Sequence, residues 1–374
     1  MQVSIPNNQS PDIIKTDIAI IGGGSAGLTL ASKLKHQPTV VVEPKTPDER
    51  DVCWALWAKS HQQKELIAAT KGQWNQWRLI DHHREVLHTS NQYNYLCLSS
   101  ADYLRNCESQ LSSNTQLIRD YAEDIKSYGR GGIFSASGKK YHAQYIYDSR
   151  PAKPDKDGLQ QHFLGIEIRT KKALKNTKIA TLMDFRVDQS RGLHFIYALP
   201  FSDRSLLIES TMISTKLEPM DWYRAAIDQW LKDQSIEIES ITREEYGVIP
   251  MHETIPEDIS LSRIGAASGA VRLSSGYAFS NIQSQVNQLV ENMERGEFSV
   301  PQVVSGTIDR LDKIYNRVLM AEPKLGVELM MRTASALDAE GFSRFMLGKA
   351  TLIDWIKVIL AMPKMPFLKQ VFKL

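Results

Sequence analysis

Several classes of protein are excluded by what this sequence has little of. Its 374 residues include only three cysteines, Cys53, Cys97 and Cys107, and no two of them stand in a C-x-x-C pair. An odd number of cysteines without that spacing predicts neither a disulfide framework nor a zinc site. We therefore expect no metal site and a reducing, cytoplasmic environment.

Long apolar runs and a strong charge of one sign are also missing. No run of about eighteen apolar residues occurs, and residues 1–15 have no apolar signal-peptide core, so we expect no membrane span and no secretory signal. The formal net charge is only +2, and no basic segment with interleaved aromatic residues is present. We therefore expect no nucleic-acid partner. A chain of this length can form two domains or one elaborate domain.

A glycine-rich turn near the N-terminus is the strongest motif. An apolar strand over 16–21 leads into Gly22, Gly24 and Gly27, which have the G-x-G-x-x-G spacing. In such turns the first glycine permits the tight turn, the second lets a pyrophosphate approach, and the third lets the helix pack on the strand. Ser25 and Ala26 then begin a helix whose N-terminus offers free N–H groups and a positive dipole end to phosphates.

A second apolar strand over 39–42 ends at Glu43 and completes a βαβ unit. A carboxylate at this place can accept hydrogen bonds from adenosine ribose hydroxyls. The unit starts close to the N-terminus and no second glycine fingerprint follows, which favours FAD over NAD. The alternative is a purely structural glycine turn.

The remaining pattern predicts an α/β fold: a Rossmann-like FAD-binding domain with an inserted β-rich substrate domain and a helical C-terminal region. A strand over 145–147 ends at Asp148, where a nucleotide domain returns to the cofactor edge; capping a turn is the alternative role for Asp148. Successive strand patterns and one helix follow. The expected division is 1–155 for the first part of the FAD-binding domain, 156–255 for the substrate domain, 256–300 for the return to the FAD-binding domain, and 301–374 for the helical region.

Four tryptophans occur in two clusters. Trp54 and Trp57 lie in a stretch that we predict to be a loop and short helix, and Trp74 and Trp77 follow. They can either pack in the core or line a site for a large apolar ligand.

Glu209 is the one carboxylate in the apolar strand over 206–211. Burial disfavours the charged form, so its pKa is expected to be raised, which suits a proton donor. The alternatives are a position on the solvent face of the strand or an ion pair with Arg204.

A second glycine-rich segment contains Gly265, Gly269 and Gly276 and precedes an amphipathic helix over 278–295. Close backbone approach there, with the helix N-terminus facing the ligand, suits a flavin site. A glycine turn before a core helix is the alternative.

The C-terminal stretch 344–374 is rich in apolar residues, with lysines at its edges. This composition suits a helix lying in the interface of an anionic leaflet. The alternative is a C-terminal helix that docks onto the protein.

Several segments in shared order resemble the bacterial lycopene β-cyclases, FAD-dependent carotenoid cyclases. The resemblance covers most of the chain. The matching segments are 148–151, 181–189, 195–202, 207–211, 244–251, 263–270, 274–279 and 362–368. Ala266 and Ala267 stand where many flavin hydroxylases carry an aspartate, which separates the chain from that redox class.

The resemblance implies that Glu209 is the catalytic acid and that Asp148 and Tyr277 lie at the flavin. It implies a lycopene-like carotenoid substrate, reduced FAD, and NAD(P)H that serves only as reductant, so that the reaction is an isomerisation. Independently of the resemblance, the cysteine content and the composition of the C-terminal stretch predict a cytoplasmic protein held peripherally at the inner face of the membrane. The resemblance does not fix the oligomeric state. The alternatives are a redox flavoenzyme, such as a reductase or monooxygenase acting on another isoprenoid or polyene, and a pigment- or flavin-binding protein without turnover.

Overall fold

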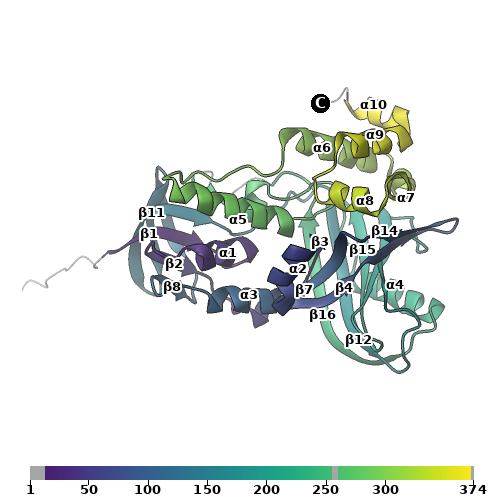
Figure 1. Ribbon diagram of the computed structural model, residues 1–374, viewed down its shortest axis with the longest axis horizontal. Helices are drawn as coiled ribbons and strands as arrows, with labels where there is room; N and C mark the ends of the chain where they lie inside the picture. Colours follow the sequence, from purple (N-terminus) through teal and green to yellow (C-terminus); the bar gives the residue numbers. More distant parts are fainter. Residues whose placement is uncertain (1–12, 255–259, 372–374) are drawn as a thin grey trace, which may run out of the picture.

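The computed structural model describes residues 13–254 and 260–371, whose strands form three sheets (Figure 1). The first sheet has the order β8, β2, β1, β11, β10 and β9, with β17 beside β11. Its central strand β1 runs parallel to both β2 and β11, which confirms the predicted βαβ unit. The strands of this sheet are β1 (Ile14–Ile21), β2 (Thr39–Val42), β8 (Thr115–Ile118), β9 (Glu123–Tyr128), β10 (Gly131–Ala136), β11 (Lys139–Asp148) and β17 (Ser262–Arg263).

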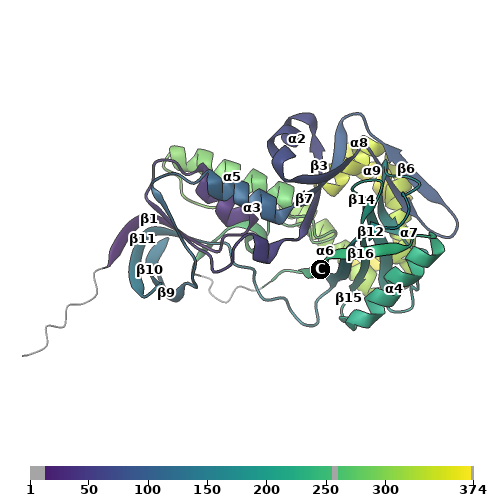
Figure 2. The same cartoon turned by 90° about the horizontal axis from the view of Figure 1, so that it is seen from below.

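Three helices cover one face of this sheet (Figure 2). They are α1 (Ser25–Lys33), α3 (Ser100–Ser109) and α5 (Phe279–Glu294). Helix α1 contacts both others, and Leu28, Val286 and Leu289 are completely buried in the core that joins the helices to β1. The helix expected over 278–295 is therefore present. It brings the second glycine-rich segment back to the first sheet.

The second sheet is larger and has the order β16, β12, β15, β14, β13, β5 and β6. Helix α4 (Met220–Asp233) covers one face, where Tyr223 and Ile227 pack against Ile166 and Ile208. Strand β14 is buried along its whole length, so the opposite face is covered as well. The strands are β5 (Gln76–Ile80), β6 (Glu85–Thr89), β12 (Gln160–Thr170), β13 (Ile179–Asp184), β14 (Leu193–Pro200), β15 (Ser205–Ser214) and β16 (Ile238–Pro250).

A third, small sheet corrects one prediction. The stretch around Trp54 and Trp57, expected to be a loop and short helix, is strand β3 (Cys53–Lys59), and α2 (Ser60–Leu66) begins only after it. Strand β3 pairs residue by residue with β7 (Tyr93–Ser99), which also pairs with β4 (Thr70–Trp74). The prediction was wrong because the backbone partner that makes this stretch a strand lies far away in the sequence.

The chain crosses between the sheets more than once. Strands β5 and β6 belong to the second sheet through the pairing of β5 with β13, although they fall within the range 1–155. From the range 256–300, β17 and α5 lie with the first sheet.

The C-terminal residues form a helical group beside the second sheet (Figure 1). Helix α7 contacts β5, β6 and α9, and α10 packs against α6. In the residues that the structure describes, no helix has the length and apolarity needed to cross a membrane. The helices are α6 (Gly306–Ala321), α7 (Gly326–Ala336), α8 (Ala339–Met346), α9 (Leu352–Ala361) and α10 (Lys364–Val371).

Candidate functional site

The three glycines of the N-terminal turn have distinct steric roles. Gly22 has a φ of +96°, a left-handed conformation that favours glycine. A Cβ at Gly27 would lie 2.0 Å from the carbonyl oxygen of Gly22, so side chains are excluded there by the protein itself. At Gly24, in contrast, a Cβ would meet no protein atom within 4 Å. The turn therefore leaves open space beside Gly24, where a pyrophosphate would approach.

The N-terminus of α1 faces this open space. Gly24 is the N-cap residue, no side chain caps the helix, and the first turn, with Ser25 and Ala26, contains no acidic residue. The free N–H groups and the dipole are thus available to an anionic ligand. These features fit the phosphates of a dinucleotide.

Glu43 lies at the end of β2 and is held against the glycine turn. Its carboxylate accepts hydrogen bonds from the N–H groups of Gly23 (2.7 Å) and Lys45 (2.9 Å). Arg50 forms an ion pair with Glu43 (3.3 Å) and donates to the carbonyl of Gly23 (3.0 Å). Glu43 therefore follows β2 as expected, and its role toward a ribose stays a prediction. Sequence reasoning missed Arg50, because nothing in the local pattern marks this residue at the end of a short 3-10 helix over Asp48–Arg50.

Asp148, at the end of β11, is buried and accepts hydrogen bonds from a neighbouring arginine. It accepts hydrogen bonds from the backbone N–H of Arg150 (3.0 Å) and from its Nε and Nη2 atoms (both 2.9 Å). Arg263 lies 4.0 Å away. The turn-capping contact that sequence reasoning offered as the alternative role is present, and the assignment of Asp148 to the cofactor stays a prediction.

The second glycine-rich segment meets the first at α1. Gly265, Gly269 and Gly276 all have positive φ, of +75°, +82° and +72°. A Cβ at Gly265 would lie 2.8 Å from the Cβ of Ala26, so this glycine allows the segment to reach the helix N-terminus. The structure therefore brings together the two segments that were predicted to meet the cofactor.

A large cavity of about 1140 Å³ extends from this junction into the second sheet. Ser25 and Gly269 line it at the glycine turns, Glu209 lines it at the second sheet, and Trp355 and Phe367 line it at the C-terminal helices. Trp54 and Trp57 also line the cavity, whereas Trp74 and Trp77 are buried in the core. Trp57 belongs to the same buried core as Trp74 and Trp77, so it has both of the roles considered for the tryptophans.

Glu209 projects from β15 into this cavity and is only 8% exposed. A position on the solvent face is therefore wrong, and no ion pair with Arg204 occurs among the described residues. Burial, followed by the negative charge of Glu245, raises the pKa of Glu209 well above its usual range. The direction of this shift agrees with the expected one, because burial favours the protonated form of a carboxyl group.

Glu245 was not singled out from the sequence. Strands β15 and β16 flank β12, and their residues Glu209 and Glu245 both pair with Gly165. A Cβ at Gly165 would lie 2.9 Å from Cγ of Glu209 and 3.1 Å from Cγ of Glu245. Because Gly165 has no side chain, the side chains of Glu209 and Glu245 can both lie beside it. The alternation of a strand, which puts Glu244 and Glu245 on opposite faces, is the signal that could have indicated Glu245.

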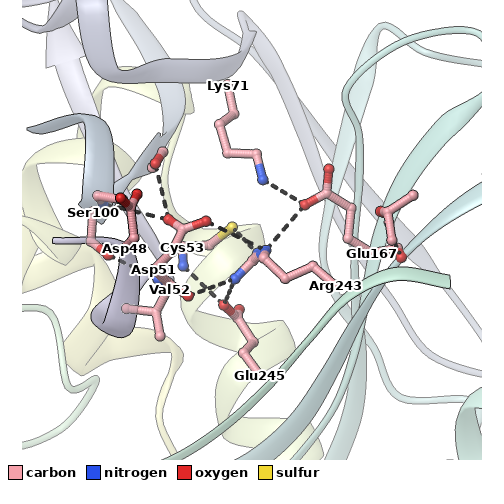
Figure 3. Close-up of polar contacts among 12 residues, drawn as sticks. Asp48, Asp51, Val52, Cys53, Lys71, Ser100, Glu167, Arg243 and Glu245 are labelled. Carbon is pink, nitrogen blue, oxygen red and sulfur yellow. Dashed lines mark hydrogen bonds and ion pairs between the residues drawn. The ribbon is translucent and has the colours of Figure 1, made fainter. Parts of the chain in front are cut away.

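A charged network holds Glu245 (Figure 3). Its Oε2 accepts hydrogen bonds from Nη1 of Arg243 (2.5 Å) and the backbone N–H of Cys53 (3.0 Å). Arg243 also contacts Glu167 (3.3 Å), which in turn pairs with Lys71 (2.5 Å). Two cations and two carboxylates therefore alternate along this network.

Three tyrosines lie next to the acid. The hydroxyl of Tyr95 is 2.9 Å from that of Tyr197 and 3.0 Å from that of Tyr277. Tyr197 is the residue opposite Glu209 on β14. Burial raises the pKa of all three phenols, so they are neutral and present polarisable rings to the cavity. Tyr277, expected at the cofactor, connects the second glycine-rich segment to Tyr95.

Comparisons with known proteins identify the family. The model of the lycopene cyclase protein family matches residues 17–371. The chain is 25% identical over 201 residues to a lycopene beta-cyclase of Pantoea ananas, covering 50% of this chain and 52% of that protein. It is 25% identical over 285 residues to a lycopene beta cyclase of Synechococcus elongatus, covering 70% and 68%. The chain thus spans about half the length of the first of these relatives.

Solved structures share the fold. A flavoprotein/dehydrogenase from Cytophaga hutchinsonii has a TM-score of 0.62, with 96% of this chain and 100% of that chain covered at 14% identity. Similarity at this identity concerns the fold alone, and it confirms the predicted fold class.

Proposed function

Because the chain belongs to the lycopene cyclase family, we propose that it is a flavin-dependent lycopene β-cyclase. It converts the acyclic ends of a lycopene-like carotenoid to β-rings without net oxidation or reduction. The observation that carries this proposal is the buried Glu209, with its raised pKa, in a cavity that is lined by aromatic side chains and reaches the dinucleotide-type glycine turn.

FAD is the cofactor that fits the glycine turn. Gly22, Gly24, Ser25, Ala26, Gly27 and Glu43 would hold its pyrophosphate and ribose, and Gly265, Gly269, Gly276 and Tyr277 would approach its ring system. The open space at Gly24 supports this placement, because it faces the free N–H groups of α1. Bound in its reduced form, FAD would supply negative charge that stabilises a cationic transition state, with NAD(P)H only restoring that form.

Glu209 starts the reaction as a general acid. Its O–H bond breaks as a C–H bond forms at the terminal alkene of the substrate, and the neighbouring double bond attacks the resulting cation to close the ring. Loss of a proton from the ring restores a double bond, so the product is an isomer of the substrate. A raised pKa favours the protonated form of Glu209, and general acid catalysis is most effective when the pKa of the acid lies near the working pH.

The walls of the cavity protect and stabilise the cation. Tyr95, Tyr197 and Tyr277 surround the acid, and aromatic faces attract positive charge. Tyr95 and Tyr197 are buried and shield Glu209 from solvent, which would limit quenching of the cation.

The C-terminal helices are proposed to lie on the inner face of the membrane. Leu352 is 76% exposed, Ile353 65% and Leu360 70%, whereas Val358 and Met362 on the other side of α9 are buried. Lysines 357, 364 and 369 are exposed among these side chains. An apolar face with adjacent lysines favours an anionic lipid surface. Ile359 and Phe367 of the same helices line the cavity, so an apolar substrate could pass from lipid to Glu209.

Cyclisation in heavy water tests the function. Holoenzyme reduced under anaerobic conditions is given lycopene in liposomes, and the product is analysed by mass spectrometry. Each ring should contain one solvent deuterium, with no net consumption of NADPH. Stoichiometric NADPH oxidation would instead identify a redox enzyme, and bound pigment without product would identify a binding protein.

A further inference from the structure

The carboxyl pair at Gly165 contains two chemically different members. Glu245 accepts hydrogen bonds from a guanidinium at 2.5 Å and from the backbone N–H of Cys53 at 3.0 Å. Both donors favour the ionised form of a carboxylate. Glu209 has no ion pair in the described residues, and its Cγ lies beside the same missing Cβ of Gly165.

We propose that Glu245 is a positioning residue for the acid: fixed as a carboxylate by Arg243 and Cys53, it holds the single proton of the pair on Glu209. The inference rests on the proposed cyclase function. Two carboxyl groups this close cannot both ionise without a large repulsion. The proton therefore stays on the member that lacks a cation, and that member is the one lining the cavity.

The other groups around Glu209 support this distribution. Cys53 and Glu245 oppose its ionisation, whereas the charge of Arg243 favours it. Arg243 forms ion pairs with both Glu167 and Glu245, so these carboxylates largely compensate its positive charge. Tyr197 and Tyr277 face Glu209 as neutral phenols. The net effect of every element packed on the acid is thus to keep it protonated.

The pair also determines what happens after proton transfer. When Glu209 has given its proton to the alkene, two carboxylates face each other beside Gly165. Their repulsion favours return of a proton from the ring to Glu209, which re-forms its O–H bond as the C–H bond breaks. This O–H proton then exchanges with solvent before the next ring closes, so each ring receives a solvent hydrogen. The site then starts and ends each turnover with one proton.

The test compares Glu245→Gln with Glu244→Gln. Glutamine at 245 keeps the shape and removes the charge, whereas Glu244 is an exposed neighbour on the opposite face that pairs with Arg224 at 2.6 Å. The pH at which cyclisation falls to half should move down by about one unit or more in Glu245→Gln, because a nearby like charge is removed. Glu244→Gln should keep the wild-type midpoint. Glu245→Asp retains the negative charge, so its midpoint should lie closer to that of the wild type than the midpoint of Glu245→Gln does.

A measurement that needs no turnover tests the role of Glu245 independently of the proposed cyclase function. The infrared C=O stretch of the protonated carboxyl, identified by its loss in Glu209→Gln, is titrated in each holoenzyme. The band should disappear at lower pH in Glu245→Gln than in the wild type. It should disappear at higher pH in Arg243→Gln, because that variant loses the positive charge that favours ionisation. Arg243→Gln provides the test if Glu245→Gln does not fold. An unchanged titration in both would overturn the inference. A shifted titration in a protein that closes no rings would instead overturn the cyclase assignment alone.

Discussion

Gly27 approaches Gly22 so closely that a Cβ at position 27 would lie 2.0 Å from the carbonyl oxygen of Gly22. Gly24, two residues after Gly22 in the same turn, has open space in place of that contact. Gly27 is thus required by the protein itself, and we propose that Gly24 is required by the cofactor. This difference yields the first prediction.

Gly24→Val should fold normally and lose FAD. The backbone of Gly24 is extended (φ −72°, ψ −167°), which valine adopts readily, so the cost arises only when a pyrophosphate must approach. Flavin absorbance after purification and the thermal unfolding of the apoprotein measure the two effects. Gly306→Val, also in open space but on α6, is the control and should stay yellow. A fully yellow Gly24→Val protein would contradict the placement of the cofactor.

Glu209→Gln should keep the fold, the flavin and carotenoid binding, and should lose ring closure. The amide has the shape of the acid but gives up no proton, so turnover should fall by roughly a hundred- to ten-thousand-fold. Anaerobic conversion of lycopene to cyclic product, with pigment binding measured in parallel, is the assay. Turnover near that of wild type would place the acid on another residue.

His194 should make the folded protein sensitive to acid. Burial lowers its pKa to about 4, and its ring nitrogens bind Asp188 O (3.0 Å) and Ser210 Oγ (2.9 Å). Below a pH of about 6.5, His194 is protonated in the unfolded chain but stays neutral in the folded protein. The free energy of unfolding therefore falls as the pH falls.

Between pH 7 and pH 5 this group should cost about 2 kcal/mol of stability. Urea unfolding should therefore show that His194→Gln loses less unfolding free energy between pH 7 and pH 5 than the wild type does, by that amount. His142→Gln, at an exposed position on β11, controls for the substitution itself. An equal acid sensitivity of wild type and His194→Gln would show that His194 does not carry the effect.

Polar substitutions on the outer face of α9 should release the protein from membranes. Ile353→Asp combined with Leu360→Asp removes two side chains that are 65% and 70% exposed, so the fold and the flavin should survive. Burial of each such side chain in lipid contributes roughly 1.5–3 kcal/mol, so co-sedimentation with anionic liposomes should fall at least tenfold. Ile241→Asp on β16, where isoleucine is 48% exposed, should bind like wild type. Equal binding of all variants would assign the α9 face another role.

The sequence alone determined the elements whose causes are local. The glycine spacing predicted the turn from β1 to α1, because steric limits on φ and on close approach act within a few residues. The apolar spacing of α5 gave that helix nearly to its ends, since one face of a helix recurs every three or four residues. The single acid of an apolar strand likewise marked Glu209.

Only the tertiary structure decided the features that depend on distant partners. Strand β3 is a strand because β7 supplies its hydrogen bonds from about forty residues away, and a loop was expected in its place. The burial of Glu209 depends on the cavity walls, which come from both sheets and the C-terminal helices. Its pairing with Glu245 depends on strand order, because β12 and its Gly165 stand between the two carboxylates. No local pattern specifies which strands become neighbours, so the chemistry of the acid was fixed only when the sheet formed.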